Sequence, residues 1–254
     1  MSLSYLIRGV RAETLKVKRS LALIAALVIP LFPAVVNLAG ALRRGLAGDA
    51  EELAALGPWG LYVRYAIKFW VIFALPMVIA LLAALLAQVD HKPKQWKQLF
   101  ALAYPRSALY AAKWLALAGV ALLSTLVFAG ANIVGGMIVA ALRPDLGLEL
   151  PLPLGEVVGK PLLAWALALA AISIHHWIAL RWPSFLSSLA VGFAASVANL
   201  FLISSYLYER AAFFPWAMPS QAYGAWRGTL LASLIAAALV YALARAEFVR
   251  RDVY

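Results

Sequence analysis

Two adjacent histidines, His175 and His176, are the residues whose type most readily suggests chemistry, because imidazole nitrogens bind metals and carry protons. Neighbouring residues of a helix diverge by about 100°, so one helix cannot easily direct both rings at one ion. Metal-binding pairs on helices usually lie four residues apart, and no third ligand occurs nearby. The chain contains no cysteine, which excludes thiolate metal sites. We therefore expect no metal site, and helix-end packing or contact with lipid headgroups for this pair.

A phosphate-binding loop would require the spacing G-x-x-x-x-G-K-[ST], whose backbone amides surround the phosphates. The nearest string is G-E-V-V-G-K-P over residues 155–161, which is one residue short and ends in proline. No nucleophile–base pair and no pair of carboxylates occurs within the apolar stretches. The chain is therefore not expected to be an enzyme or to bind a cofactor itself.

Arg64 and Lys68 lie four residues apart, so they share one face of a helix that is otherwise mostly apolar. Charges at membrane depth are costly and often mark a transport pathway. Near a helix end the same side chains extend to the headgroups instead, which is the interpretation that we favour. Asn37, Asn132 and Asn199 also lie within apolar stretches, where hydrogen bonds between helices and contacts with a substrate explain them equally well.

The elements that position these residues are long apolar helices. The 254 residues are 65% hydrophobic and 13% charged, whereas soluble domains average about a quarter charged residues. Stretches such as 78–87 are apolar on every face and rich in Ala and Leu, which favours membrane-spanning helices. The net charge of +11 accompanies no basic segment with interleaved aromatic residues, so no nucleic-acid partner is expected. The expected fold class is an all-α membrane protein in a lipid bilayer.

Six transmembrane helices are expected, at about 21–42, 61–89, 114–142, 162–180, 185–208 and 228–244. Pro30 and Pro33 should kink the first of them. In residues 1–20, apolar positions recur at helical spacing among five cations. The chain thus divides into an amphipathic helix over 1–20, lying in the lipid interface, and a six-helix transmembrane domain over 21–254. A solvated N-terminal helix is the alternative for residues 1–20.

The distribution of Lys and Arg indicates how the helices are oriented, because cytoplasmic loops accumulate these residues. With the N-terminus inside, the cytoplasmic segments hold fourteen Lys and Arg, and the outer segments hold eight together with seven of the eleven acids. We therefore expect a multi-pass protein of the bacterial inner membrane with both termini cytoplasmic. A cytoplasmic loop then covers 90–113, and an aromatic outer hairpin, re-entrant or lying on the surface, covers 208–227.

The predicted cytoplasmic loop is basic, yet it carries an apolar patch of Trp96, Leu99, Phe100 and Leu102. A short helix over 94–102 would bring these side chains to neighbouring faces, and Pro105 would end the segment. A solvated loop has little reason to expose such side chains unless something covers them. They fit either docking against a protein partner or anchoring in the headgroups.

Three segments resemble ABC-2-type transporter permeases, which have the type V exporter fold. E-T-L-K-V-K-R-S over residues 13–20 is similar to the elbow helix that precedes their first span. W-K-Q-L-F-A-L-A-Y-P-R-S-A-L-Y-A-A-K-W over residues 96–114 is similar to the loop between their second and third spans. P-W-A-M-P over residues 215–219 is similar to a segment of the bacteriocin and lantibiotic-immunity branch.

The resemblance implies a permease that forms a dimer with a second copy or a paralogue and binds two cytosolic ABC ATPase subunits, which hold ATP and Mg²⁺. It also implies a coupling helix that inserts into the ATPase, and a substrate path between the two permeases, lined by their second and fifth spans. The coupling residues would be Gln95, Trp96, Lys97, Leu99, Phe100, Leu102 and Arg106. The elbow-helix residues would be Glu13, Lys16 and Arg19, and the path residues Arg64, Lys68, Ser196, Asn199 and Ser204.

The function implied by this resemblance is that of the permease subunit of an ATP-driven exporter. Such a subunit would move an amphipathic or hydrophobic substrate, for example an antimicrobial peptide or a similar toxin, out of the membrane or cytoplasm. The alternative is a six-helix membrane scaffold or sensor without an ATPase partner. A gene for a Walker-motif ATPase beside this one would favour the exporter.

Overall fold

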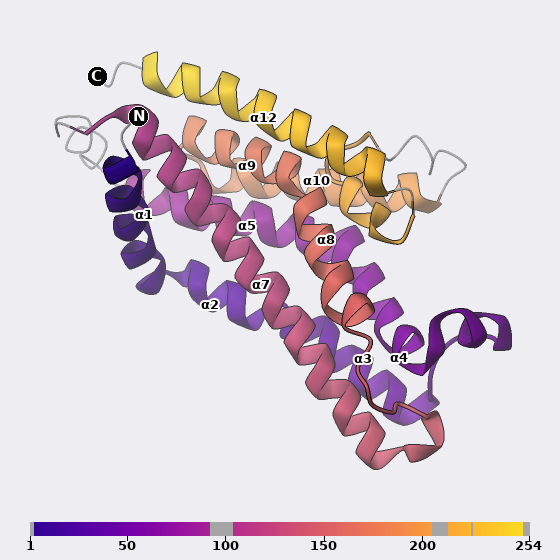
Figure 1. Ribbon diagram of the computed structural model, residues 1–254. Helices are drawn as coiled ribbons and strands as arrows, with labels where there is room; N and C mark the ends of the chain where they lie inside the picture. Colours follow the sequence, from indigo (N-terminus) through magenta and orange to yellow (C-terminus); the bar gives the residue numbers. More distant parts are fainter. Residues whose placement is uncertain (1–2, 92–103, 205–212, 225, 251–254) are drawn as a thin grey trace.

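The computed structural model describes residues 3–91, 104–204, 213–224 and 226–250. Within these ranges all regular secondary structure is helical, and Figure 1 shows an elongated bundle. The α-helices are α1 (Leu3–Lys18), α2 (Leu21–Val28), α3 (Leu31–Arg44), α4 (Ala50–Phe69), α5 (Leu75–His91), α7 (Arg106–Leu142), α8 (Lys160–Leu167), α9 (Leu169–Arg181), α10 (Phe185–Ser204) and α12 (Trp226–Arg250). Two π-helices, η1 (Trp70–Ala74) and η3 (Gly155–Gly159), and two 3-10 helices, η2 (Pro144–Leu146) and η4 (Met218–Tyr223), join them.

Five helical segments in the described ranges are long and apolar enough to cross a membrane. They are Leu21–Arg44, Ala50–His91, Arg106–Leu142, Phe185–Ile203 and Trp226–Arg250. A sixth arises where Gly155–Leu167 and Leu169–Arg181, which are bent by 48° at a break, count as one span. The structure therefore confirms an all-α protein with five to six candidate membrane spans.

Several helices extend beyond the expected spans. α7 begins at Arg106, eight residues before the expected start of the third span, and α12 continues to Arg250. The second span begins at Ala50, but Gly57 has a φ of 67°, so residues 50–56 form a separate helical turn that projects sideways in Figure 1. Hydropathy marks only the apolar part of a helix, whereas its hydrogen bonding continues into polar surroundings.

The expected kink in the first span is confirmed at Pro30. α2 ends at Val28 and α3 begins at Leu31, and prolines lack the N–H group that would continue the helical ladder. Pro33 likewise has no N–H group for the carbonyl of Ile29, and the amide of Phe32 donates to that carbonyl instead over 3.2 Å, which is a tighter 3-10 contact.

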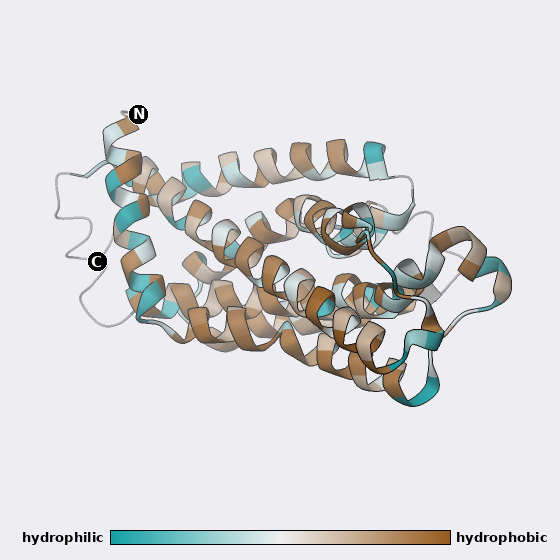
Figure 2. Ribbon diagram, turned by 60° about the horizontal axis from the view of Figure 1, so that its bottom comes forward, coloured by the Kyte–Doolittle hydropathy of each residue, from teal (hydrophilic) through white to brown (hydrophobic). Residues whose placement is uncertain are grey.

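α1 lies crosswise at one end of the bundle, hereafter the α1 end, where the last turns of α12 also lie (Figure 1). Figure 2 shows hydrophobic residues along the middle of the bundle and hydrophilic residues gathered at its two ends. On α1, Leu3, Ile7 and Leu15 are exposed, while Glu13 and Val17 are buried against the bundle. This distribution fits a helix in the membrane interface, which stays a prediction.

Close packing of the spans depends on small residues where large side chains cross. Trp70 of η1 stacks on Phe128 of α7 with ring centroids 4.7 Å apart, and both are fully buried. Any side chain at Gly136 would overlap the buried Trp59 ring, and one at Gly192 would overlap Ala80. Because lipid tails are as apolar as the helices, this close packing is a main source of helix association.

Gly136→Leu should destabilise the protein, because Trp59 would have to leave its position against α7. Overpacking of this kind costs about 1–3 kcal/mol, so we expect a melting temperature lower by several degrees in detergent. Gly119→Leu is the matched control on the same helix, since a side chain there would meet open space. Equal melting temperatures for the two variants would contradict this account of the packing.

Candidate functional site

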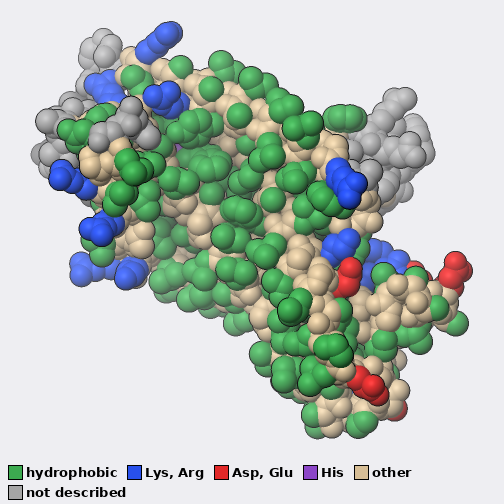
Figure 3. All heavy atoms as spheres, in the orientation of Figure 1, with side chains coloured by type: hydrophobic (Ala, Val, Ile, Leu, Met, Phe, Trp, Pro, Cys, Tyr) green, Lys and Arg blue, Asp and Glu red, His purple; other side chains and the backbone are tan. Residues whose placement is uncertain are grey.

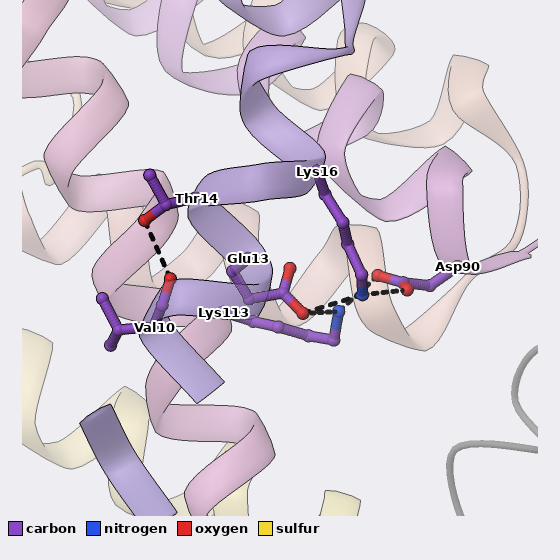
Figure 4. Close-up of polar contacts among 6 residues, drawn as sticks. All are labelled: Val10, Glu13, Thr14, Lys16, Asp90 and Lys113. Atoms are coloured by element: carbon purple, nitrogen blue, oxygen red, sulfur yellow. Dashed lines mark hydrogen bonds and ion pairs between the residues drawn. The ribbon is translucent and has the colours of Figure 1, made fainter. Parts of the chain in front are cut away.

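Four charged side chains from three helices meet at the α1 end (Figure 4). Lys16 of α1 contacts Oε1 of Glu13 and Oδ1 of Asp90, each over 2.8 Å. Lys113 of α7 contacts the same Glu13 oxygen over 2.9 Å and also pairs with Oδ2 of Asp90. We call these four residues the ion cluster.

The ion cluster is shielded from solvent and electrically balanced. The side chains of Glu13, Asp90 and Lys113 are only 7%, 3% and 5% exposed. Each carboxylate contacts both ammonium groups, so neither sign of charge is left uncompensated, which is the condition under which burial of charge is tolerated. Removal of one member would leave a buried charge in excess.

Lys16 is the most exposed member of the ion cluster, and the two carboxylates of the cluster change its pKa. Burial by itself lowers the pKa of Lys16, but the carboxylates of Glu13 and Asp90 outweigh that effect and raise it above its usual value. A raised pKa means that the protonated form stabilises the fold at neutral pH. This contribution is lost only as the pH rises through the folded-state pKa, well into the alkaline range.

The ion cluster joins the two ends of the predicted coupling loop. Asp90 lies one residue before the end of α5, and Lys113 lies in the second turn of α7. Tyr104 donates a hydrogen bond from its hydroxyl to the carbonyl of Tyr5 over 2.6 Å, and Nε2 of His91 lies 2.7 Å from the carbonyl oxygen of Ala179. The residues that flank 92–103 are therefore held against α1 and α9.

The sequence did not assign a role to Asp90 or Lys113, which served only as limits of the loop. Each of these residues is a lone charge at the end of an otherwise apolar span, and their opposite signs are a signal that could have predicted the ion pair. Among the residues that were predicted to couple to the ATPase, only Arg106 lies within the described ranges. Its guanidinium donates to the carbonyl of Val249 over 3.0 Å, which connects the start of α7 to α12. Gln95, Trp96, Lys97, Leu99, Phe100 and Leu102 lie outside the described residues.

Arg64 and Lys68, two of the predicted path residues, lie toward the end of the bundle opposite α1. Arg64 pairs with Glu52, and Lys68 is exposed one turn further along α4. Lys68 and Asp90 are twenty-two positions apart on nearly continuous helix, which at about 1.5 Å per residue spans roughly 33 Å. That length matches the thickness of the hydrocarbon core, so Lys68 and Asp90 can lie at opposite boundaries of a bilayer. This position is what Lys68 needs if its side chain is to extend to the headgroups.

Asn199 connects three elements that are distant in the sequence. Pro76 has no N–H group to offer to the carbonyl of Ile72, and that carbonyl lies within the π-helix η1. The side-chain amide of Asn199 donates to the Ile72 carbonyl over 2.8 Å and to the Trp216 carbonyl over 3.0 Å. Because both partners are acceptors, the NH₂ group must face them, and Oδ1 of Asn199 is buried with no partner among the described residues.

The other two predicted path residues lie on the same helix, α10. The Ser196 hydroxyl is fully buried and donates over 2.8 Å to the carbonyl of Gly192 within its own helix. Ser204 is the last residue of α10, and its side chain lies outside the described set. The structure thus brings Ser196 and Asn199 to one buried face, separate from Arg64 and Lys68.

His175 is at the centre of a hydrogen-bonded chain inside the bundle. The indole N–H of Trp216 donates to Nε2 of His175 over 2.9 Å, so the ring proton must lie on Nδ1. Nδ1 is 3.3 Å from the Ser188 hydroxyl, which donates to the Ala80 carbonyl over 3.1 Å. Full burial assigns His175 to helix packing and excludes contact with headgroups.

His176 packs edge-on to the Tyr110 ring, with ring centroids 4.7 Å apart. The two adjacent histidines therefore face different neighbours, as expected from helical geometry. Within the described ranges, no group of three or more His, Asp or Glu side chains is arranged to hold a metal ion.

The aromatic segment at residues 213–224 packs into the bundle, a placement that the sequence left open. Met218, Ser220 and Gln221 are buried, and Lys160 of α8 donates to the carbonyl of Ala222 over 3.0 Å. Together with the contact between Trp216 and His175, these interactions hold residues 213–224 against the bundle, where η4 packs on α8 and α12. A short aromatic run could not show which helix face would receive it.

Comparison with known proteins identifies the class to which this arrangement belongs. Residues 9–199 match the family described as ABC-2 family transporter protein. The match extends from α1 to Asn199 and includes the ion cluster, and the chain belongs to this family. No curated protein and no solved structure matches the chain significantly. The chain is accordingly the membrane subunit of an ABC transporter, a class that generally has no ATPase site of its own.

Lys113→Met should destabilise the fold strongly, because Glu13 and Asp90 would keep only one ammonium group between them. Breaking a buried pair by removing one partner costs about 3–5 kcal/mol, which should appear as a large loss of melting temperature. The double variant Lys113→Met/Asp90→Asn restores the charge balance and should recover much of that loss. Lys18→Met carries the same substitution at an exposed position of α1, so it is the control and should change little. A single variant as stable as wild type would contradict a structural role for the ion cluster.

Asn199→Leu should also destabilise the protein, because the carbonyls of Ile72 and Trp216 would lose their donor. We expect a cost of about 1–3 kcal/mol, measured as thermal unfolding in detergent. Ser196→Ala removes only a bond within α10 and should be nearly neutral. If Asn199→Leu melts like wild type but alters ATPase activity of the assembled transporter, the residue serves the substrate path and its structural assignment is wrong.

Proposed function

We propose that this chain is the permease subunit of an ATP-driven exporter, with ATP and Mg²⁺ bound by a separate cytosolic subunit. Membership of the ABC-2 family implies an ATPase partner and a membrane environment. The observation that carries the proposal is the ion cluster, which fastens α1, α5 and α7 together beside the segment 92–103. A partner that moved this segment would move both spans that flank it.

The proposed coupling works through rigid attachment. Residues 94–102 would insert into a groove of the ATPase through Trp96, Leu99 and Phe100, with Lys94 and Lys97 at the rim, as hot-spot contacts are usually arranged. Asp90 and Lys113 keep the start of α7 fixed to the end of α5. A displacement of this segment on ATP binding would then move the second and third spans together, because the ion pair keeps their ends from moving apart.

The proposed orientation places the α1 end in the cytoplasm of a bacterial cell. Figure 3 shows Lys and Arg side chains over this end, around α1 and the end of α12. Helices that alternate in direction bring Lys16, Lys113 and Arg181 to the same end, while Asp49, Glu51 and Glu52 lie at the opposite end. The asymmetry supports cytoplasmic termini by the positive-inside rule.

The proposed assembly contains two permeases, as a homodimer or with a paralogue, and two ATPase subunits. The substrate path would lie between the permeases, along the second and fifth spans. Exposed Phe193 and Phe201 of α10 and exposed Tyr65 and Lys68 of α4 would give such a path apolar walls and a cation. An amphipathic or hydrophobic substrate suits these walls, and the similarity of residues 215–219 to the immunity branch favours an antimicrobial peptide.

The double variant Lys97→Glu/Phe100→Asp should abolish co-purification of a Walker-motif ATPase, which should accompany the wild type at about one to one. Loss of an apolar anchor and its basic rim removes the core of the proposed interface. The tagged chain is expressed from its native gene neighbourhood and purified in nanodiscs. Arg43→Glu, at the opposite end, is the charge-matched control and should keep the ATPase.

Two results would contradict the proposal in different ways. An ATPase that stays with the double variant would show that residues 94–102 are not the coupling segment. A wild-type chain that purifies alone, under conditions that preserve a known ABC transporter, would instead favour a six-helix scaffold or sensor.

A further inference from the structure

A groove opens at the α1 end between the α1–α2 junction, the last turns of α5 and the start of α10. Its volume is about 860 Å³, and its lining includes Lys16, Arg19, Ser20, Leu85, Val89 and Phe185. Its two cationic side chains come from α1 and the α1–α2 junction, and α5 contributes Gln88 beside the apolar Leu85 and Val89. We propose that this groove binds one anionic phospholipid of the cytoplasmic leaflet, an inference that rests on the proposed orientation of the α1 end.

Arg19 supplies the positive charge that would recognise a phosphate group. Lys16 also lines the groove, but Glu13 and Asp90 already neutralise it. Arg19 is exposed, and no acid among the described residues pairs with it. The mouth therefore carries net positive charge.

The apolar part of the groove fits an acyl chain. Leu85 and Val89 lie on α5, and Phe185 is the first residue of α10. Leu85 is five positions before Asp90, which places it about 7.5 Å further along the helix and away from the polar end. A lipid whose phosphate meets Arg19 would thus have its chain beside Leu85 and Phe185, in the order of headgroup and tail that a leaflet imposes.

A second copy of the chain is less suited to this groove because the acids described at the α1 end already have partners. The acids described at the α1 end are Glu13, Asp90 and Glu247. The first two belong to the ion cluster, and Glu247 pairs with Arg181 over 2.8 Å. A phospholipid supplies both the anion that Arg19 requires and the hydrocarbon that the groove accommodates.

Native mass spectrometry of the delipidated full-length chain tests the proposal directly. Phosphatidylglycerol and phosphatidylethanolamine with identical acyl chains are titrated, and we expect one phosphatidylglycerol to bind in preference. Arg19→Gln should weaken its binding about tenfold, the size of one charge-assisted hydrogen bond. Arg11→Gln is the matched control, because Arg11 is exposed on α1 and does not line the groove. Equal retention of the two lipids, or equal loss in both variants, would overturn a specific site.

A photo-crosslinking amino acid at position 85 identifies the occupant independently. In a bilayer that contains phosphatidylglycerol, the expected product is the chain plus the mass of one lipid, and the yield should fall with Arg19→Gln. A covalent dimer of the chain would show that a second copy fills the groove and would overturn the proposal. ATPase co-purification is measured in the same preparations, so failure of lipid binding is distinguishable from failure of the exporter assignment.

Discussion

The pairing of Lys113 with Glu13 and Asp90 is the interaction on which the arrangement of the α1 end depends. A single one of these charges, placed at the end of a span and shielded from water, would be strongly unfavourable. Together with Lys16 they form a balanced set, and that set exists only if α1, α5 and α7 meet. The requirement for charge balance therefore fixes the position of an amphipathic helix that has little apolar surface inside the bundle.

The same requirement for satisfied polar groups operates deeper in the bundle. Where no water is available, every freed backbone group must find a partner within the protein. Pro76 cannot donate to the carbonyl of Ile72, and the amide of Asn199 donates to that carbonyl while it also holds the segment 213–224 through Trp216. His175 receives the indole N–H of Trp216 and continues the chain of hydrogen bonds to α10. These polar groups bind the protein's own backbone and side chains, and Oδ1 of Asn199 is buried without a partner among the described residues.

These two polar networks give a coherent view of an ABC-2 membrane subunit. One network joins the ends of the segment between the second and third spans, and the other joins the second, fourth and fifth spans to the segment 213–224. Movement at the α1 end would be transmitted along α5, since this helix belongs to both networks. The lipid groove borders the same helix, so the surrounding leaflet would contact the element that connects the two.

The sequence by itself determined the helical membrane fold, the approximate spans and the kink at Pro30, because hydropathy and proline chemistry are local properties. It also determined the family, through the short segments at residues 13–20 and 96–114, which lie within the range that the family matches. It did not determine the partners of Asp90 and Lys113, the acceptors of Asn199, or the burial of Trp216. These depend on which helix faces meet, and an apolar helix surface gives no directional signal for its neighbours. Only the tertiary structure decided them, by bringing together polar groups that are up to 127 positions apart.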